Sequence, residues 1–285
     1  MIGNTKMDKF NEELEQIQVE EEKLKTLELL QAYEGRDEII TSEQAREILK
    51  QANLKPAAKF FSKIPGLDAM LDGFREGDVV VISAPTKNGK TTLAQTFTAS
   101  LSESGVRSLW FSYEMTQNEF LSKFPEPLPF FTLPKTLQVN SLDWLERKIV
   151  EAIAKHGVKV VFIDHLHFLI DMSFIGQKGN VSLLIGSIMR KLKQIALKWE
   201  VAIVLIAHTT KIQFEKEPDL SDIRDSSFIS QEADTVLMIW RRREKETGEF
   251  GSRAWVAVAA NRRNGKVGKV PLILQNNRFF EEAKE

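Results

Sequence analysis

Hydrophobic residues in the last two thirds of the chain fall into short, nearly continuous runs, separated by longer stretches with helical spacing. Runs of this kind, rich in β-branched residues, are typical of strands that are covered on both faces. The predicted strands cover residues 78–83, 108–114, 158–165, 201–208, 234–240 and 254–261. Amphipathic stretches such as 142–155 and 183–199 separate several of them. Because strands that alternate with helices usually pair in parallel, we predict an α/β fold with a largely parallel sheet and helices on both faces.

The start of the chain follows a different pattern. Hydrophobic positions recur every three or four residues within 7–17 and again within 24–33, which indicates one or two amphipathic helices. A further helix is predicted over 42–52, because Thr41 and Gln44 have the spacing of a capping box. Helices this short cannot bury a hydrophobic stripe alone. They should lie on the main domain, on a neighbouring subunit or on each other.

We therefore divide the chain into a helical N-terminal arm, residues 1–55, which we expect to act in oligomerisation, and a main domain, residues 56–285. A simpler interpretation, in which the arm only caps its own domain, stays open. Charge supports the division, because residues 1–38 carry a net charge of −6 while the whole chain carries −1. The remainder is accordingly positive, which permits contact with nucleic acid without proving it.

Composition excludes several classes of protein. The chain of 285 residues is long enough for one large α/β domain and an appendage. Its apolar runs are all shorter than the roughly 20 residues that cross a bilayer, so we expect no membrane association. It contains no cysteine, which excludes disulfides and thiolate metal sites. Because its first ten residues lack a signal-peptide core, we expect an intracellular, cytoplasmic protein.

The segment "SAPTKNGKTT", which joins the first predicted strand to a helical stretch, has the features of a phosphate-binding loop. In such loops, backbone N–H groups and the helix N-terminus surround the phosphates, the lysine contacts their oxygens and the threonine hydroxyl binds Mg²⁺. The expected nucleotide-binding residues are Ala84, Pro85, Thr86, Lys87, Asn88, Gly89, Lys90, Thr91 and Thr92. A side chain at Gly89 would collide with a phosphate. Ala84 stands where the motif usually begins with glycine, but none of these roles belongs to that position. A chance match is the alternative, and the strand before the loop and the helix after it argue against it.

Polar residues also stand where other strands end. Ligands of open α/β sheets bind at the carboxyl ends of the strands, which directs attention to Glu114, Asp164 and His208. Asp164 is placed to hold a magnesium-bound water, although a buried structural aspartate is the alternative. Glu114 is the candidate general base that takes a proton from the water attacking the γ-phosphate. Its alternative is an ordinary surface glutamate.

Five blocks of sequence together resemble one family. In order, they are "IPGLDAMLDGFREGDVVVISAPTKNGKTT", "LWFSYEM", "VVFIDHLHFL", "LSDIRDSSFISQEADTVLMIWR" and "ANRRNGKVGKVPLIL". They look like the successive motifs of the RecA-like motor of DnaB-type replicative helicases, over about residues 60 to 280. Loops of this family commonly start with alanine, which accounts for Ala84. The resemblance implies ATP and Mg²⁺ as cofactors, with Lys90 and Thr91 on phosphate and metal, Glu114 as catalytic base and Asp164 as the second acidic element.

The resemblance assigns two further residues, both with departures. The family usually has glutamine where His208 stands, although phage and organellar relatives also use histidine; His208 would sense the γ-phosphate. A buried structural histidine is the alternative. Arg263 aligns with the arginine that the family supplies to the nucleotide of the neighbouring subunit, but Asn261 replaces the usual lysine. The alternative is a solvated hairpin tip, since Asn264 and Gly265 favour a turn.

The family's DNA-binding loops align with residues 174–180 and 223–227, so Lys178 and Arg224 are the candidates for holding phosphates of single-stranded DNA. Neither stretch offers stacked aromatic residues, which favours a grip on the backbone. The sequence thus predicts an ATP-driven DNA helicase that is reduced to its motor and forms a ring, expected to be a hexamer of identical subunits, with an unidentified loader or primase. The alternative is a RecA- or KaiC-like ATPase that assembles on DNA or on a partner as an adaptor or switch without unwinding.

Overall fold

The chain forms two compact units, Met1–Pro56 and Ala57–Glu285. The computed structural model describes residues 20–21, 23–24, 39–51, 57–138, 141–170, 181–209, 217–223, 226–243 and 248–283. Most of the helical pattern predicted before residue 38 therefore lies outside the described residues, as do Lys178 and Arg224. The division of labour between an oligomerising arm and a motor domain stays a prediction.

In the first unit, α2 (Ser42–Gln51) is the helix predicted over 42–52. The capping box at its start is confirmed. The backbone N–H of Thr41 donates to Gln44 Oε1 at 2.8 Å, and the N–H of Gln44 donates to Thr41 Oγ1 at 3.1 Å. These two bonds satisfy donors that have no partner within the helix. Ile48 and Leu49 on α2 are exposed.

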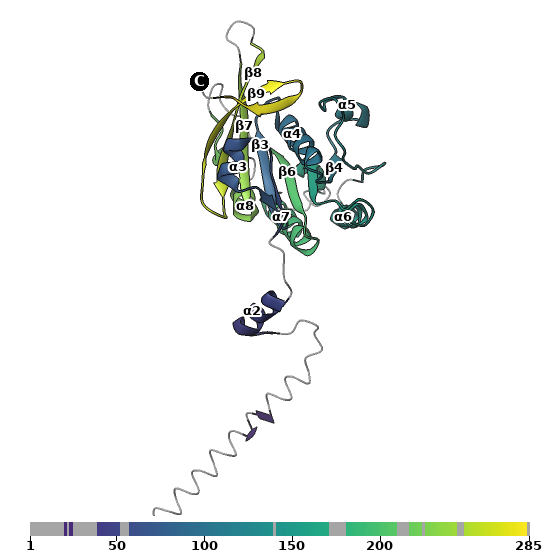
Figure 1. The fold of residues 1–285 in the computed structure, drawn as a ribbon, viewed down its shortest axis with the longest axis vertical. Helices are drawn as coiled ribbons and strands as arrows, with labels where there is room; N and C mark the ends of the chain where they lie inside the picture. The colour runs from purple at the N-terminus through teal and green to yellow at the C-terminus, as the bar shows by residue number, and fades with distance from the viewer. Residues whose placement is uncertain are drawn as a thin grey trace, which may run out of the picture. The chain divides into compact units, whose positions relative to one another are not determined.

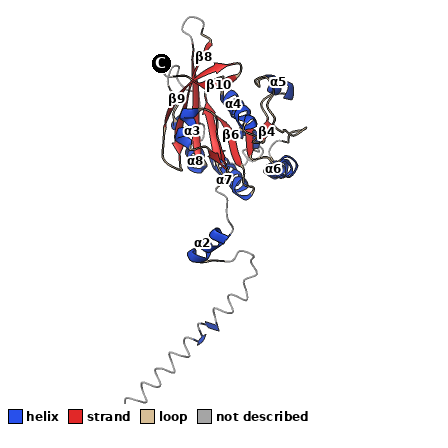
Figure 2. Ribbon diagram, in the orientation of Figure 1, coloured by secondary structure: helices blue, strands red, loops and turns tan. Residues whose placement is uncertain are grey.

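The second unit is built on a sheet of eight strands in the order β10-β9-β8-β7-β3-β6-β5-β4 (Figures 1 and 2). The strands are β3 (Val79–Ala84), β4 (Ser108–Ser112), β5 (Val160–Asp164), β6 (Ala202–His208), β7 (Thr235–Arg243), β8 (Phe250–Asn261), β9 (Gly268–Gln275) and β10 (Arg278–Glu281). A small separate sheet pairs β1 (Lys59–Phe60) with β2 (Phe74–Arg75). The five strands from β7 to β4 are parallel, which confirms the predicted largely parallel α/β sheet.

The other three strands depart from that pattern. β8, β9 and β10 each run antiparallel to their neighbour, because short connections instead of helices join them. The run predicted over 254–261 is therefore the end of a longer, antiparallel strand. These strands extend the sheet beyond β7 (Figure 1).

Helices cover both faces of the sheet (Figure 2). They are α3 (Pro65–Leu71), α4 (Lys90–Glu103), α5 (Gln117–Ser122), α6 (Leu142–His156), α7 (Val181–Lys198) and α8 (Ser226–Glu232), with short 3-10 helices η1 (Leu166–Leu169) and η3 (Leu220–Asp222). The two helices predicted over 142–155 and 183–199 are confirmed to within two residues. No helix in the described part of the chain is long and apolar enough to cross a membrane.

The central strand β3 shows why the sheet needs cover on both sides. All six of its residues are buried. Val79 and Val81 pack with residues of α6 and α7, whereas Val80 and Ile82 pack with residues of α3 and α4. Each such aliphatic side chain contributes roughly 1.5 to 3 kcal/mol when it is removed from water.

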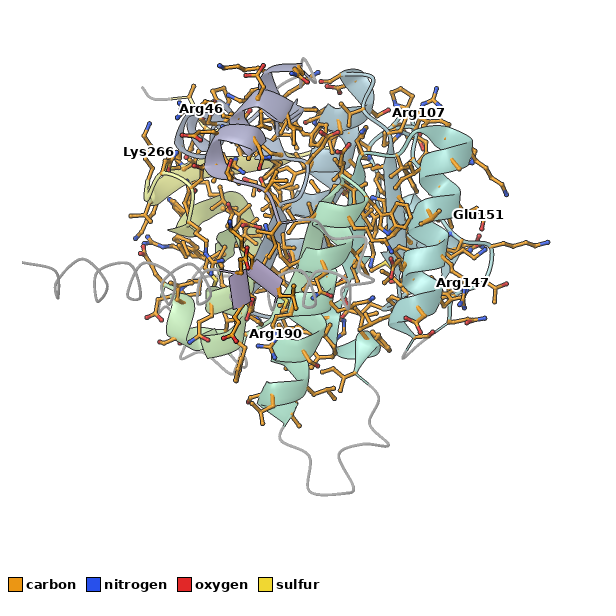
Figure 3. All side chains as sticks on the ribbon, turned by 90° about the horizontal axis from the view of Figure 1, so that it is seen from below. Arg46, Arg107, Arg147, Glu151, Arg190 and Lys266 are labelled. Carbon is orange, nitrogen blue, oxygen red and sulfur yellow. The ribbon has the colours of Figure 1, made fainter. Side chains whose placement is uncertain are left out.

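The outer helices are amphipathic in the same sense. On α6, Trp144 and Ile149 are buried against the sheet, while Arg147 and Glu151 lie on the side of the helix that faces away from it (Figure 3). Polar residues on this outer side leave the hydrophobic stripe free for the core.

Parallel pairing brings the carboxyl ends of four strands to one edge of the sheet. Ala84 at the end of β3 is the register partner of His208 at the end of β6. Asp164 at the end of β5 pairs with Ser112 at the end of β4, and with Ile206 on its other side. The candidate site is built on this edge.

Candidate nucleotide-binding site

The glycine and lysine loop connects β3 to α4, as the sequence predicts. Gly89 immediately precedes α4 with φ 95° and ψ 22°, a left-handed conformation that favours glycine. Lys87 also has a positive φ, of 66°. The loop therefore turns sharply into a helix of 14 residues, whose N-terminal N–H groups and dipole form a natural site for an anion.

Two contacts hold this loop in shape. Asn88 Oδ1 accepts a 2.8 Å hydrogen bond from the backbone N–H of Arg241 on β7, and Asn88 Nδ2 donates to the carbonyl of Thr86 at 3.1 Å. A Cβ on Gly89 would lie 2.9 Å from Cζ of Phe279, a buried residue of β10. Glycine is thus required here by a neighbouring side chain of the chain itself, and the phosphate collision expected from the sequence would add to that requirement.

Lys90, at the start of α4, is buried, and its Nζ donates to the carbonyl of Ala84 at 3.2 Å. Burial lowers the pKa of Lys90, and the nearby carboxylates of Glu114 and Asp164 oppose that change. The three charged groups therefore lie close enough to influence one another, although they come from three different parts of the sequence.

Asp164 lies fully buried at the end of β5. Its Oδ2 accepts a 2.8 Å hydrogen bond from Thr91 Oγ1, whereas its Oδ1 has no hydrogen-bond partner among the described residues. Burial raises the pKa of Asp164 to about 6. A buried carboxylate with an unsatisfied oxygen is costly unless a cation compensates it. The Thr91 hydroxyl and the Asp164 carboxylate are hard oxygen ligands, so these residues fit Mg²⁺.

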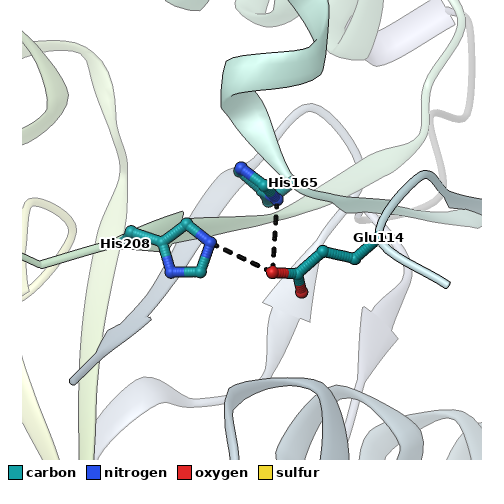
Figure 4. Close-up of side chains that lie close together, drawn as sticks. All are labelled: Glu114, His165 and His208. Carbon is teal, nitrogen blue, oxygen red and sulfur yellow. Dashed lines mark ion pairs between the residues drawn. The ribbon is translucent and has the colours of Figure 1, made fainter. Parts of the chain in front are cut away.

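Glu114 stands two residues beyond β4 and contacts two histidines (Figure 4). Its Oε1 lies 3.3 Å from Nε2 of His208 and 3.8 Å from Nδ1 of His165. The two imidazole rings meet edge to face, with centroids 4.3 Å apart. The three side chains come from the ends of β4, β5 and β6, which are adjacent strands.

The environment sets the charges of these groups. Hydrogen bonding to His208 lowers the pKa of Glu114, so this carboxylate is ionised at neutral pH. Burial, together with the charge of His208, lowers the pKa of His165 to about 4, so its imidazole is neutral there. An ionised carboxylate at the edge of the site can accept a proton from a water molecule.

Arg263 lies elsewhere. Its Nη2 forms a 2.6 Å ion pair with Oδ1 of Asp78, which directly precedes β3. The loop follows the other end of this strand of six residues, so the guanidinium is on the order of 20 Å from Lys90 of the same chain. The turn expected at Asn264 and Gly265 is present between β8 and β9, and the N–H of Gly265 donates to the carbonyl of Asn261 at 3.0 Å.

The remaining predicted loop residues lie where the motif places them. Pro85 is partly buried, Thr86 and Lys87 are exposed, and Thr92 lies in the first turn of α4, where its carbonyl accepts from Thr96. The sequence did not single out His165 or Phe279. His165 directly follows Asp164 in "IDHLHF", a signal that could have been used, whereas nothing local to Phe279 indicates its contact with Gly89.

A strand, a glycine and lysine loop and a helix at the carboxyl edge of a mainly parallel sheet define the phosphate-loop class of nucleotide-binding domains. Within that class, the chain belongs to the family of the DnaB-like helicase C terminal domain, whose model matches residues 60–125 and 130–281. The resemblance predicted over residues 60 to 280 is thereby confirmed.

Relatives and solved structures agree with this assignment. The chain is 24% identical over 274 residues to a probable replicative DNA helicase of Trieres chinensis, covering 82% of this chain and 60% of that protein. It is 24% identical over 247 residues to the replicative DNA helicase DnaB of Treponema pallidum, covering 74% and 53%. The chain thus spans little more than half the length of these curated relatives.

The fold matches that of two solved structures. One is an isolated ATPase domain, which superimposes with a TM-score of 0.69 at 20% identity and covers 87% of this chain and all of that one. The other is a DnaB-like replicative helicase, described with its interactions with primase. It gives a TM-score of 0.65 at 20% identity and covers 97% of this chain and 76% of that one.

Proposed function

We propose that this chain is the motor of an ATP-dependent DNA helicase of the DnaB type, which acts as a hexameric ring and moves along single-stranded DNA in replication. The observation that carries the proposal is the convergence of Lys90, Asp164 and Glu114 at one edge of the sheet, in a chain of the DnaB-like family. Family membership supports an ATPase, and the arrangement of these side chains supports hydrolysis of the terminal phosphate.

Each residue has a role that follows from its position. The loop backbone and the start of α4 hold the phosphates, and the buried ammonium of Lys90 contacts their oxygens. Thr91 would hold Mg²⁺ directly, and Asp164 would hold it through a water molecule; the ion supplies positive charge against the phosphates. Glu114 then accepts the proton of the attacking water.

His208 connects the base to the loop. It is the register partner of Ala84, the residue that begins the loop, and its Nε2 contacts Glu114. A γ-phosphate that attracts His208 would change this contact with the base. His208 is therefore the proposed sensor of the bound nucleotide.

Contacts with DNA and with other proteins belong to the same proposal. Lys178 and Arg224 are the proposed ligands of single-stranded DNA. The solved DnaB-like relative is described with its interactions with primase, which makes a primase the first partner class to test.

The function is tested by measuring ATP hydrolysis with and without single-stranded DNA, and ATP-dependent displacement of one strand from a forked duplex. Lys90→Ala should abolish hydrolysis and weaken nucleotide binding, because it removes a buried positive charge from the loop. Glu114→Gln should bind ATP normally and turn over about 10² to 10⁴ times more slowly, the usual contribution of a general base. Lys123→Ala, on the exposed side of α5, is the matched control.

The outcomes separate the alternatives. Hydrolysis that single-stranded DNA stimulates, without any strand displacement, would favour the adaptor or switch related to RecA and KaiC. Turnover near the wild-type rate in the Glu114→Gln protein would assign the base to another residue. Absence of hydrolysis in the wild-type protein, with DNA and Mg²⁺ present, would refute the proposal.

A further inference from the structure

The contact between Glu114 and His208 does not account for His165. At 3.8 Å, the separation between His165 Nδ1 and Glu114 Oε1 is too long for a hydrogen bond. The Nδ1 atom is nevertheless buried, and it has no hydrogen-bond partner among the described residues. Buried polar atoms without a partner are uncommon and call for an explanation.

The distances around Glu114 match those between the ligands of a tetrahedral metal ion. Zinc bonds to histidine nitrogen and carboxylate oxygen are about 2.0 to 2.2 Å long, so two ligand atoms of one tetrahedron lie about 3.3 to 3.6 Å apart. The observed separations from Glu114 Oε1 are 3.3 Å to His208 and 3.8 Å to His165. One ligand atom from each side chain lies within 4.8 Å of those from the other two. Shifts of a few tenths of an ångström would complete three corners.

The chemistry of the three groups selects the ion. Two imidazoles and one carboxylate suit zinc and similar transition metals, whereas magnesium prefers oxygen ligands in an octahedron. Three protein ligands also leave a fourth position for water, as in open zinc sites. The ends of three adjacent strands carry Glu114, His165 and His208, so the backbone already holds them together before an ion binds.

We propose that Glu114, His165 and His208 form a binding site for Zn²⁺, separate from the magnesium position at Thr91 and Asp164. Zinc in this site takes the carboxylate oxygen that would otherwise accept a proton from water. A bound ion therefore holds the motor in an inactive state. This consequence rests on the proposed ATPase function, whereas binding of the ion does not.

Binding is tested directly on the full chain without nucleotide, after removal of metals by chelation. Zn²⁺ is titrated in competition with a chromophoric zinc chelator, and Co²⁺ is added in parallel because its visible spectrum distinguishes tetrahedral from octahedral coordination. The wild-type protein should bind one ion with a tetrahedral cobalt spectrum. His165→Asn should weaken binding by about a hundredfold or more, because losing a mere hydrogen-bond partner of a ligand already costs about 10-fold to 100-fold.

Two further variants control the result. Glu114→Gln should also lose the ion, while His156→Asn, at the far end of α6, should bind as the wild type does. Circular dichroism checks that each variant is folded. Equal zinc affinity in the wild type and in a folded His165→Asn protein, or an octahedral cobalt spectrum, would overturn the proposal.

The enzymatic readout separates this inference from the proposed function. Stoichiometric zinc should inhibit ATP hydrolysis by the wild-type protein, and a chelator should restore it, whereas His165→Asn should resist zinc relative to its own activity in chelator. Inhibition that is equal in both proteins would contradict the site. A metal-free protein that binds zinc as expected yet never hydrolyses ATP would refute the motor function and leave the zinc site standing.

Discussion

At the scale of single residues, Asp164 is the clearest conflict between stability and function. Its carboxyl group has a pKa of about 6 in the folded chain against an ordinary value of 3.8, because burial disfavours the ionised form. The folded state thus binds a proton more tightly than the unfolded state, and stability falls as the pH rises from about 4 to 6. A displacement of about two units corresponds to about 3 kcal/mol above this window.

Asp164→Asn should therefore stabilise the nucleotide-free protein by up to about 3 kcal/mol at pH 8, and by about half as much at pH 5. The free energy of unfolding, measured with urea at both pH values, checks this. Asp143→Asn, an exposed position on α6, should show no such pH-dependent gain. A loss of stability in Asp164→Asn at pH 8 would mean that the hydrogen bond from Thr91 outweighs burial.

The sequence predicted the individual site residues better than their mutual contacts. Lys90, Thr91 and Asp164 were found from a loop motif and a strand end, and the structure places them together. The placement of His165 against Glu114 depends on the pairing of β4, β5 and β6, and strand register is a property of the whole sheet. No pattern within one segment could indicate it.

At the scale of elements, the loop depends on β10 as well as on its flanking strand and helix. Gly89 and Gly105 both have positive φ, of 95° and 74°. A Cβ at Gly105 would meet nothing within 4 Å, whereas a Cβ at Gly89 would lie 2.9 Å from the ring of Phe279, which is buried and cannot easily move. Comparing the two positions separates backbone strain from collision.

Gly105→Ala should destabilise the protein by about 1 to 2 kcal/mol, the cost of a left-handed alanine, and leave ATP binding intact. Gly89→Ala should cost more and weaken ATP binding. Adding Phe279→Leu to Gly89→Ala should restore part of the loss, because the shorter side chain removes the colliding atom. Thermal unfolding and titration with a fluorescent ATP analogue measure both effects. Equal losses in the two single variants would show that β10 does not constrain the loop.

Elements were predictable where one period of hydrophobic residues is sustained. The parallel strands and the helices α6 and α7 belong to this group. The antiparallel strands were harder to interpret, because their apolar runs look the same as those of parallel strands. Only the short connections from β7 to β10 show their direction, and β10 is just four residues long.

At the scale of the whole molecule, we propose that the N-terminal arm holds subunits together. Ile48 and Leu49 on α2 are exposed, and in position this helix resembles the linker helix that DnaB-type proteins dock onto the neighbouring motor. Burying both side chains against another subunit would contribute roughly 3 to 6 kcal/mol at each contact.

Deleting residues 1–55 should leave a folded protein whose ATP hydrolysis depends steeply on protein concentration, because subunits then dissociate on dilution. Sedimentation velocity and hydrolysis assays over a range of concentrations measure this. The double variant Ile48→Ser and Leu49→Ser should behave in the same way. A truncated chain with unchanged sedimentation and activity would show that the arm caps its own domain or binds a different partner.

Arg263 raises the question of how one nucleotide site is completed. Within one chain, its guanidinium binds Asp78 before β3, whereas Lys90 follows the opposite end of that strand, roughly 20 Å away. An arginine that stabilises the transition state must contact the phosphates, so Arg263 can do so only at the site of another subunit. The arginine finger implied by family resemblance therefore requires assembly of the ring.

Mixing an Arg263→Ala chain with a Lys90→Ala chain tests this requirement. Each protein alone should be nearly inactive, because an arginine finger commonly contributes about 10³ or more in rate. In mixed rings, some interfaces join the intact Lys90 of one chain to the intact Arg263 of the next, so partial hydrolysis should return and peak near equal proportions. Crosslinking of differently tagged chains verifies that mixed rings form. Mixed rings that stay inactive at every ratio would mean that Arg263 only stabilises the hairpin through Asp78.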